Sequence, residues 1–233
     1  MTGTLSIVAT PIGNMEDITF RALRTLKECD VIYAEDTRVI SKLLARYEIS
    51  KPLQRLDAAT EHTKAKEVIE RLEEGERVVF VSDAGTPGIS DPGARLVRAV
   101  RQSCEALREA GQIPPTIEAI PGASALTAAL SIAGMSSDEF LFFGFLPHKK
   151  GRQTALKFIA ASLVPVVLYE SPHRILKLLK ELGEAGFSKV SIGRELTKIH
   201  EEFLEGAPAD LAADLEKRGA ARGEFVVIVY PKH

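Results

Sequence analysis

The chain alternates short apolar segments, rich in β-branched residues, with longer segments of helical periodicity. A helix is predicted over residues 94–110, because apolar side chains recur there at the spacing of one helix face, namely at Leu96, Val97, Val100, Cys104 and Leu107. Strands are predicted at residues 5–9, 31–34, 78–81, 116–120, 140–143, 166–169, 190–194 and 225–230. Strands separated by helices form parallel sheets through crossover connections, so the pattern predicts an α/β fold.

The strongest interruption of this alternation is the segment from Gly111 to Pro115, with roughly half of the predicted strands on each side. A chain of 233 residues is long enough for two domains with separate cores. We therefore expect an N-terminal α/β domain over residues 1–119 and a C-terminal α/β domain over residues 120–233.

Composition narrows the class of protein. With 45% hydrophobic and 27% charged residues, the chain is typical of globular proteins, and no apolar run approaches the length of a membrane span or a signal-peptide core. We therefore expect a cytoplasmic protein that does not associate with membranes. Cys29 and Cys104 form neither a C-x-x-C pair nor a cluster with histidines, so they are expected to be core thiols, and no metal site is predicted.

The net charge of −2 weighs against a nucleic-acid partner, because binding to phosphates needs Lys and Arg side chains gathered on one face. A local basic patch would have to supply them. The run at residues 148–152, which includes Lys149 and Lys150, concentrates positive charge after a predicted strand. A solvated loop is the usual meaning of such a run, but together with Arg174 it would also form a phosphate-contacting patch.

Ligands of parallel sheets bind beyond the carboxyl ends of the strands, so the loops at those ends are the first place to search. After the first predicted strand, Pro11 stiffens the chain, and Gly13 before Asn14 allows close approach of a ligand, although a plain tight turn explains the sequence as well. Glu35, Asp36, Thr37 and Arg38 follow the second predicted strand. Asp36 or Thr37 is expected to cap the next helix, a role compatible with function.

The third such loop, residues 82–93, is longer than a connection requires and consists mostly of small residues. Its first part, Ser82-Asp83-Ala84-Gly85-Thr86-Pro87, exposes backbone groups to a polar ligand, and Asp83 can accept hydrogen bonds from a ribose or an amino group. A structural loop is the less favoured alternative. The fourth loop, with Gly122, Ala123 and Ser124, fits either close approach to a nucleoside or ordinary strand–helix packing.

In the second half of the chain, Ser171 is expected to be the N-cap of a helix and Pro172 its first residue, which leaves Tyr169, Glu170 and Arg174 without a structural reason.

Several motifs are absent. The chain has no G-x-G-x-x-G, Walker A, H-E-x-x-H or G-x-S-x-G sequence, which removes the main support for nicotinamide, P-loop, zincin and serine-hydrolase readings. The loops instead suit a nucleoside-like ligand without a pyrophosphate.

Taken together, these segments resemble the ribosomal RNA methyltransferases of the tetrapyrrole-methylase superfamily, collinearly over nearly the whole chain. The segments that carry the resemblance are residues 9–14, 35–38, 82–87 with 91–93, 121–122, 144–147, 169–171 with 173–174, and 194–198. Similar enzymes carry a His-x-His-Asn cluster where this chain reads Asp57 to Thr63, with only His62 comparable, so that segment is assigned no catalytic role. Many relatives also continue into a C-terminal helical region.

The resemblance implies a two-domain fold, with a mainly parallel Rossmann-like N-terminal sheet, a mixed C-terminal sheet and a cofactor cleft between them. It implies a homodimer that uses S-adenosylmethionine to methylate the 2′-hydroxyl of a cytidine in the decoding centre of 16S ribosomal RNA, within the 30S subunit. The cofactor contacts that it implies are Asp83, Ala84, Gly85, Thr86, Pro87, Gly122, Ala123, Ser124, Tyr169 and Leu196.

The substrate is expected to lie against Pro11, Gly13, Asn14 and the turn at residues 35–38, with Arg38 or Arg174 holding a phosphate. Glu35, Asp36 and Glu170 are the candidates for a general base that accepts the proton of the attacking hydroxyl. Two alternatives stay open. One is a methyltransferase of the same superfamily acting on a corrin-type tetrapyrrole, and the other is a module that binds S-adenosylmethionine or RNA without catalysis.

Overall fold

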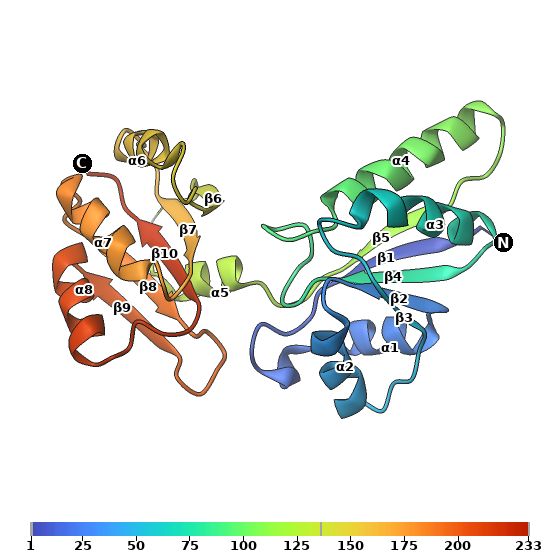
Figure 1. Cartoon of the computed structure of the whole chain (residues 1–233), viewed down its shortest axis with the longest axis horizontal. Helices are drawn as coiled ribbons and strands as arrows, with labels where there is room; N and C mark the ends of the chain where they lie inside the picture. The colour runs from blue at the N-terminus through green and yellow to red at the C-terminus, as the bar shows by residue number, and fades with distance from the viewer. Residues whose placement is uncertain (1, 136, 233) are drawn as a thin grey trace. The chain divides into compact units, whose positions relative to one another are not determined.

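The computed structural model describes residues 2–135 and 137–232, and the chain divides into two compact units after Ser124 (Figure 1). Each unit is built around one five-stranded sheet. The break at Gly111 to Pro115 lies inside the first unit, as the connection that leads into the last strand of the first sheet. In the described part of the chain, none of the helices has the length and apolar character needed to cross a membrane.

The first unit holds a fully parallel sheet of strand order β3-β2-β4-β1-β5. The bounds of its strands are β1 Thr4–Val8, β2 Val31–Ala34, β3 Leu53–Arg55, β4 Arg77–Val81 and β5 Thr116–Ile120. Its helices are η1 Met15–Asp17, α1 Phe20–Glu28, α2 Thr37–Arg46, α3 Glu61–Glu73 and α4 Ala94–Glu109. Side chains of α1 and α2 pack on one face of the sheet, and those of α3 and α4 pack on the other (Figure 1).

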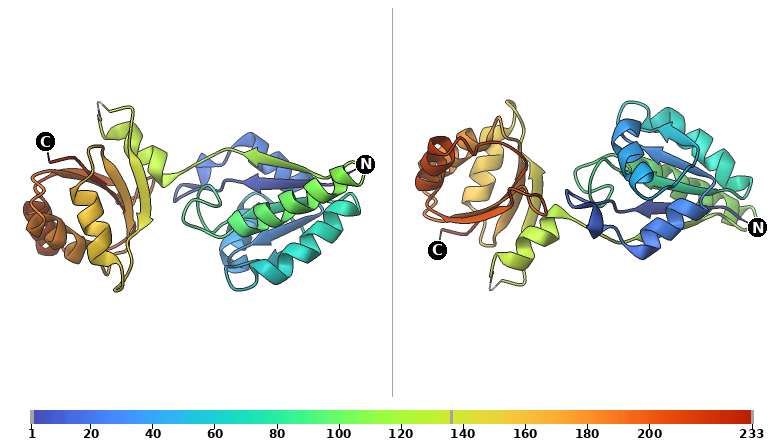
Figure 2. Two further views of the ribbon diagram at one scale, coloured as in Figure 1. Left: turned by 90° about the horizontal axis from the view of Figure 1, so that it is seen from above. Right: turned by 90° about the horizontal axis from the view of Figure 1, so that it is seen from below.

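The second unit holds a mixed sheet of strand order β6-β7-β10-β8-β9, in which β6 and β7 are parallel and the other neighbours are antiparallel. Its elements are α5 Ala125–Ile132, β6 Leu141–Phe145, α6 Arg152–Ala160, β7 Val166–Glu170, α7 Ile175–Glu184, β8 Val190–Arg194, β9 Glu202–Gly206, α8 Pro208–Lys217 and β10 Phe225–Val229. Helices α6, α7 and α8 cover one face of this sheet, while α5 lies on the other side (Figure 2).

The predicted fold class is confirmed, with a parallel first sheet and a mixed second sheet. The predicted helix at residues 94–110 is α4, which buries Leu96, Val100 and Cys104. Two strands were not predicted. Strand β3 has only three residues, and β9 is an edge strand whose residues are only partly buried, so neither carries a continuous apolar run.

One buried carboxylate fixes the start of α4. Glu61, in the first turn of α3, is 3% exposed, and its Oε1 accepts hydrogen bonds of 3.0 Å from the amides of Gly93, Arg95 and Leu96. These amides belong to the first turn of a helix, which has no intrahelical acceptors for them, so Glu61 takes the place of a capping side chain. The same contact fixes the end of the loop at residues 82–93.

Glu61→Ala is therefore expected to lower the free energy of unfolding of the first unit by about 2–4 kcal/mol, because it leaves buried amides without acceptors. The change can be measured by calorimetry. Glu73→Ala is the matched control on the same helix, since the exposed Glu73 accepts a surface hydrogen bond from the hydroxyl of Ser103, and it should change the unfolding temperature little. Equal losses in the two variants would contradict the capping role.

Candidate active site

The loops after β1, β4 and β5 are joined at the carboxyl edge of the first sheet. The amide of Thr10 donates to the carbonyl of Gly85 at 2.9 Å, and the amide of Gly85 donates back to the carbonyl of Thr10 at 3.0 Å. The Thr86 hydroxyl donates to the carbonyl of Ala123 at 3.1 Å. The structure thus brings the loop that holds Gly85 and Thr86 together with the loop that holds Ala123, which the sequence placed after different strands.

The small residues of these loops are needed for this close packing. A Cβ on Gly85, whose φ is +75°, would lie 3.1 Å from Cγ2 of Ile12, and a Cβ on Gly122 would lie 3.0 Å from Cβ of Ala9. Beside them, Ala84 is half-buried and Pro87 is buried, whereas Gly122 itself is exposed. Three loop backbones therefore approach one another with few side chains between them.

Carboxylates gather at the same edge of the sheet. Oδ1 of Asp83 accepts a hydrogen bond of 2.9 Å from the amide of Asp36, which ties the loop after β4 to the turn after β2. Asp36 is also the N-cap of α2, as predicted, because its side chain accepts from the amide of Arg38. Its carboxylate receives further hydrogen bonds from the exposed guanidinium group of Arg38.

The environments of these carboxylates differ in their effect on protonation. Burial raises the pKa of Glu35 above its ordinary value, and the negative charges of Asp83, Asp57 and Asp36 raise it further. Burial likewise raises the pKa of Asp83. In contrast, the hydrogen bonds from Arg38 lower the pKa of Asp36 to about 2. Glu35 is therefore better suited than Asp36 to accept a proton near neutral pH.

The remaining residues of the predicted substrate side lie on the loop after β1. Pro11 is half-buried, and Gly13 and Asn14 are exposed. The Asn14 side chain accepts a hydrogen bond from the amide of Glu16 and caps η1. Asn14 therefore shapes this loop in addition to any contact with a substrate.

In the second unit, Tyr169 and Leu196 lie over one face of the sheet. Tyr169 of β7 is paired with Val226 of β10, and Val226 is paired in turn with Gly193 of β8. Leu196 is buried against Gly193, where an added Cβ would lie 3.1 Å from Cδ1 of Leu196. The hydroxyl of Tyr169 accepts a hydrogen bond from the amide of Leu126 at the start of α5. The position of Tyr169 is thus fixed by the backbone pairing of β7 with β10 and by the hydrogen bond of its hydroxyl to α5.

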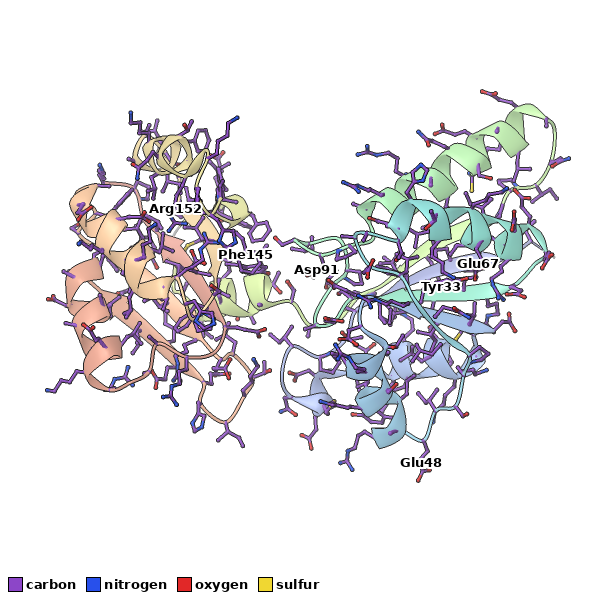
Figure 3. The ribbon with its side chains drawn as sticks, in the orientation of Figure 1. Tyr33, Glu48, Glu67, Asp91, Phe145 and Arg152 are labelled. Carbon is purple, nitrogen blue, oxygen red and sulfur yellow. The ribbon has the colours of Figure 1, made fainter. Side chains whose placement is uncertain are left out.

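Glu170 occupies a different environment. Its side chain has no exposed surface and lies 3.2 Å from Nε of Arg174 and 3.9 Å from Arg152. Arg152 also pairs with Glu181 at 2.6 Å, and Arg174 donates to the carbonyl of Leu146. This enclosed cluster, around the residue labelled Arg152 in Figure 3, favours a structural role for Glu170 over proton transfer.

The same cluster changes two sequence-based expectations. Arg174 is engaged inside the unit, so the predicted basic patch retains only the exposed side chains of Lys149 and Lys150. The prediction that Ser171 caps a helix beginning at Pro172 is wrong. Helix α7 begins at Ile175, after a turn in which the carbonyl of Ser171 accepts from the amides of Arg174 and Ile175.

The sequence analysis did not assign Thr10, Asp57 and Glu61 a role at the carboxyl edge of the first sheet. Thr10 acts through its backbone, which leaves no signal in the residue type. Asp57 follows β3, a strand too short to be recognised, and Glu61 is one of many charged residues in α3. Among residues 2–135 and 137–232, no group of three or more His, Cys, Asp and Glu side chains is arranged to hold a metal ion.

Comparisons with known proteins agree with this architecture. Residues 4–212 match the model of the Tetrapyrrole (Corrin/Porphyrin) Methylases. The chain is 42% identical over 231 residues to Ribosomal RNA small subunit methyltransferase I of Thermotoga maritima, covering 99% of both proteins. It is 44% identical over 230 residues to the protein of the same name from Borrelia garinii subsp. bavariensis, covering 97% of both. The crystal structure of a diphthine synthase superposes with a TM-score of 0.73 at 17% identity, over 99% of this chain and 90% of that one.

The chain belongs to the tetrapyrrole methylase family. It is accordingly a methyltransferase that uses S-adenosylmethionine. The edge of the first sheet fits that cofactor. Gly85, whose added Cβ would press on Ile12, lets the small-residue loop at residues 83–87 pack closely on the loop after β1. The carboxylates of Glu35 and Asp83 complement the positive charges of its sulfonium and amino groups.

Gly85→Ala is expected to weaken S-adenosylmethionine binding by at least about ten-fold, because the new Cβ pushes against Ile12 and separates the two hydrogen-bonded loops. Isothermal titration calorimetry measures this loss. Gly88→Ala is the matched control, since Gly88 also has a positive φ but an added Cβ would meet nothing within 4 Å. Both variants carry the backbone strain, so an equal loss in both would show that close packing at Gly85 is not what matters.

Proposed function

We propose that this protein methylates the 2′-hydroxyl of a cytidine in the decoding centre of 16S ribosomal RNA. The observation that carries the proposal is its similarity over nearly the full length to enzymes named Ribosomal RNA small subunit methyltransferase I. The arrangement of the first unit is compatible with it, because methylation of an alcohol needs a proton acceptor, and Glu35 has a raised pKa next to the proposed cofactor loop.

We propose the following roles for the residues of the site. Bound S-adenosylmethionine supplies an electrophilic methyl group. The proposed cofactor contacts in the first unit are the loops at residues 83–87 and 122–124, and those proposed in the second unit are Tyr169 and Leu196. Pro11, Gly13 and Asn14 lie on the proposed substrate side, and Arg38, which is exposed while paired with Asp36, is the proposed contact to a phosphate.

Glu35 is the proposed general base. As the ribose oxygen forms its bond to the methyl carbon and the bond from that carbon to sulfur breaks, the Glu35 carboxylate accepts the hydroxyl proton. Asp83 contributes by its charge, which helps to keep the pKa of Glu35 raised. Alignment of the hydroxyl by the surrounding loops provides the rest of the acceleration.

The assembly and location of the protein also belong to this proposal. Enzymes that modify ribosomal RNA act where ribosomes are assembled, so we propose that the protein works in the cytoplasm on the 30S subunit, as a homodimer. Methylation of a corrin-type tetrapyrrole is the alternative within the family.

The substrate is tested by mass spectrometry of 16S RNA from cells with and without the protein. We expect one ribose-methylated cytidine to lose its methyl group when the protein is absent and to regain it when the purified protein acts on isolated 30S subunits. A precorrin offered in the same assay is expected to stay unmodified. An unchanged ribose-methylation pattern would exclude the proposed substrate, whereas methylation of the precorrin would favour the tetrapyrrole alternative.

Glu35→Gln is expected to lower single-turnover methylation by about 10²- to 10⁴-fold, the usual contribution of a general base. In the wild type the rate should rise with pH through the raised pKa of Glu35 and then level off, because only the ionised carboxylate accepts a proton. That rise should disappear in the variant. Asp36→Asn, in which the carboxyl of low pKa is replaced, should keep the rise.

Stability provides an independent control for the same variant. Because the pKa of Glu35 is raised in the folded state, its ionised form opposes folding above that pKa, and this effect vanishes below the ordinary pKa of the carboxyl. Glu35→Gln should therefore melt at a higher temperature than the wild type near pH 7 and at a similar temperature in acid. Full activity in a correctly folded Glu35→Gln protein would exclude Glu35 as the base.

A further inference from the structure

An RNA substrate needs cations for its phosphates, and the edge of the first sheet does not provide enough of them. Glu35, Asp36 and Asp83 make that edge acidic, and Asp36 already pairs with Arg38. In the second unit, Arg152 and Arg174 are held by Glu170 and Glu181. Of the cations predicted for that unit's basic patch, Lys149 and Lys150 stay exposed, and a larger set of exposed cations lies on another surface of the first unit.

Helices α1 and α2 form the most basic surface of the first unit. Their exposed side chains include six cations and one acid, Glu28, which pairs with Arg77 of β4 at 2.8 Å. The cations are Arg21, Arg24 and Lys27 of α1 and Arg38, Lys42 and Arg46 of α2. Within the described residues, Arg38 is the only one of the six in an ion pair. In a chain of net charge −2, this is a marked segregation of charge.

The opposite face of the sheet shows the contrast. Helices α3 and α4 together carry seven cations and six glutamates, and ion pairs join several of the charges of α3. On the α1 and α2 side, the acids lie at the margins. Glu16 and Asp17 are in η1, and Glu48, labelled in Figure 3, follows the end of α2.

An exposed aromatic ring stands at the edge of this basic surface. Phe20, the first residue of α1, is 94% exposed and follows the loop that leads from β1 and η1. Met15 and Val39 are partly exposed nearby in the chain, and the Tyr47 hydroxyl donates to the carbonyl of Met15, which joins the end of α2 to η1. A single exposed apolar side chain is ordinary. Together with unpaired cations, it matches the combination that binds single-stranded nucleic acids.

We propose that the outer surface of α1 and α2, made up of Phe20, Arg21, Arg24, Lys27, Lys42 and Arg46, binds unpaired substrate RNA, and we call it the α1–α2 face. Its cations contact phosphates, and Phe20 stacks on a base. The proposal rests on the proposed ribosomal RNA substrate. It explains how an acidic protein with an acidic catalytic edge holds a polyanion, since α1 and α2 begin at the carboxyl edge of the sheet while their cations lie on the surface outside it.

The cations are tested with the double variant Arg24→Gln and Lys42→Gln in the full-length protein. Binding to isolated 30S subunits and to transcribed 16S RNA is measured over a series of salt concentrations. Each lost phosphate contact should reduce the slope of log affinity against log salt by about one, so a reduction of about two is expected, with at least a ten-fold loss of affinity at low salt. S-adenosylmethionine binding should stay unchanged.

The matched control is Arg98→Gln with Arg101→Gln, two exposed arginines of α4 on the opposite face of the sheet. It removes the same charge and should leave the salt slope nearly as in the wild type. A loss equal to that of the α1–α2 variant would show a general charge effect and overturn the proposal.

Stacking is tested at Phe20. Phe20→Ala should weaken RNA binding by about ten-fold or more, whereas Phe20→Trp should retain it, because the larger ring also stacks. Both should melt at the wild-type temperature, since the side chain is almost fully exposed. Equal binding by the alanine and tryptophan variants would exclude stacking.

The outcomes separate this inference from the proposed function. If the wild type methylates 16S RNA and the α1–α2 variants bind it with unchanged salt slopes, the α1–α2 face is excluded while the proposed substrate stands. If the variants change the oligomeric state without changing RNA affinity, the surface is a contact between copies of the chain and the inference is overturned. A wild type that neither binds nor methylates ribosomal RNA overturns the proposed function and the α1–α2 face with it.

Discussion

The two backbone hydrogen bonds between Thr10 and Gly85 are the contact on which the first unit's site depends. They hold the loop after β1 against the loop after β4, and the hydroxyl of Thr86 then reaches the carbonyl of Ala123 after β5. Such close approach of backbones requires small residues, and Gly85 adopts a positive φ at the contact. The small-residue sequence after β4 is therefore a packing requirement.

Charge is arranged around that packing in a consistent way. Strands β2 and β4 end in carboxylates, and the hydrogen bond from the Asp36 amide to Asp83 brings these ends together. Burial raises the pKa of Glu35 and the negative charges of its neighbours raise it further, while Arg38 neutralises Asp36. The raised pKa suits Glu35 to accept a proton, whereas the low pKa of Asp36 keeps that neighbour ionised. The cations of α1 and α2 lie outside this acidic edge, so the proposed proton acceptor and the proposed RNA-binding surface occupy different parts of one unit.

The sequence predicted the parts of the fold that have a regular pattern. The apolar face of α4, the buried strands and the small-residue loop at residues 82–87 all appear in the structure, and Asp36 caps α2 as expected. Strands β3 and β9 were missed because they are short or exposed at an edge. The burial of Arg152 and Arg174 was not predictable. In the sequence both read as exposed basic residues, and only the folded structure shows that each lies beside Glu170.

The family assignment and the substrate rest on different features of the chain. The match to the tetrapyrrole methylases spans residues 4–212 and follows the strands, helices and loops that build both sheets. A fold that is shared at 17% identity with a diphthine synthase does not by itself select a substrate. Selection of a substrate requires exposed side chains that are not needed to build the fold. Phe20 and the cations of α1 and α2 meet that condition, because their helices are held by apolar side chains on the inner face and could carry other outer residues without changing the core.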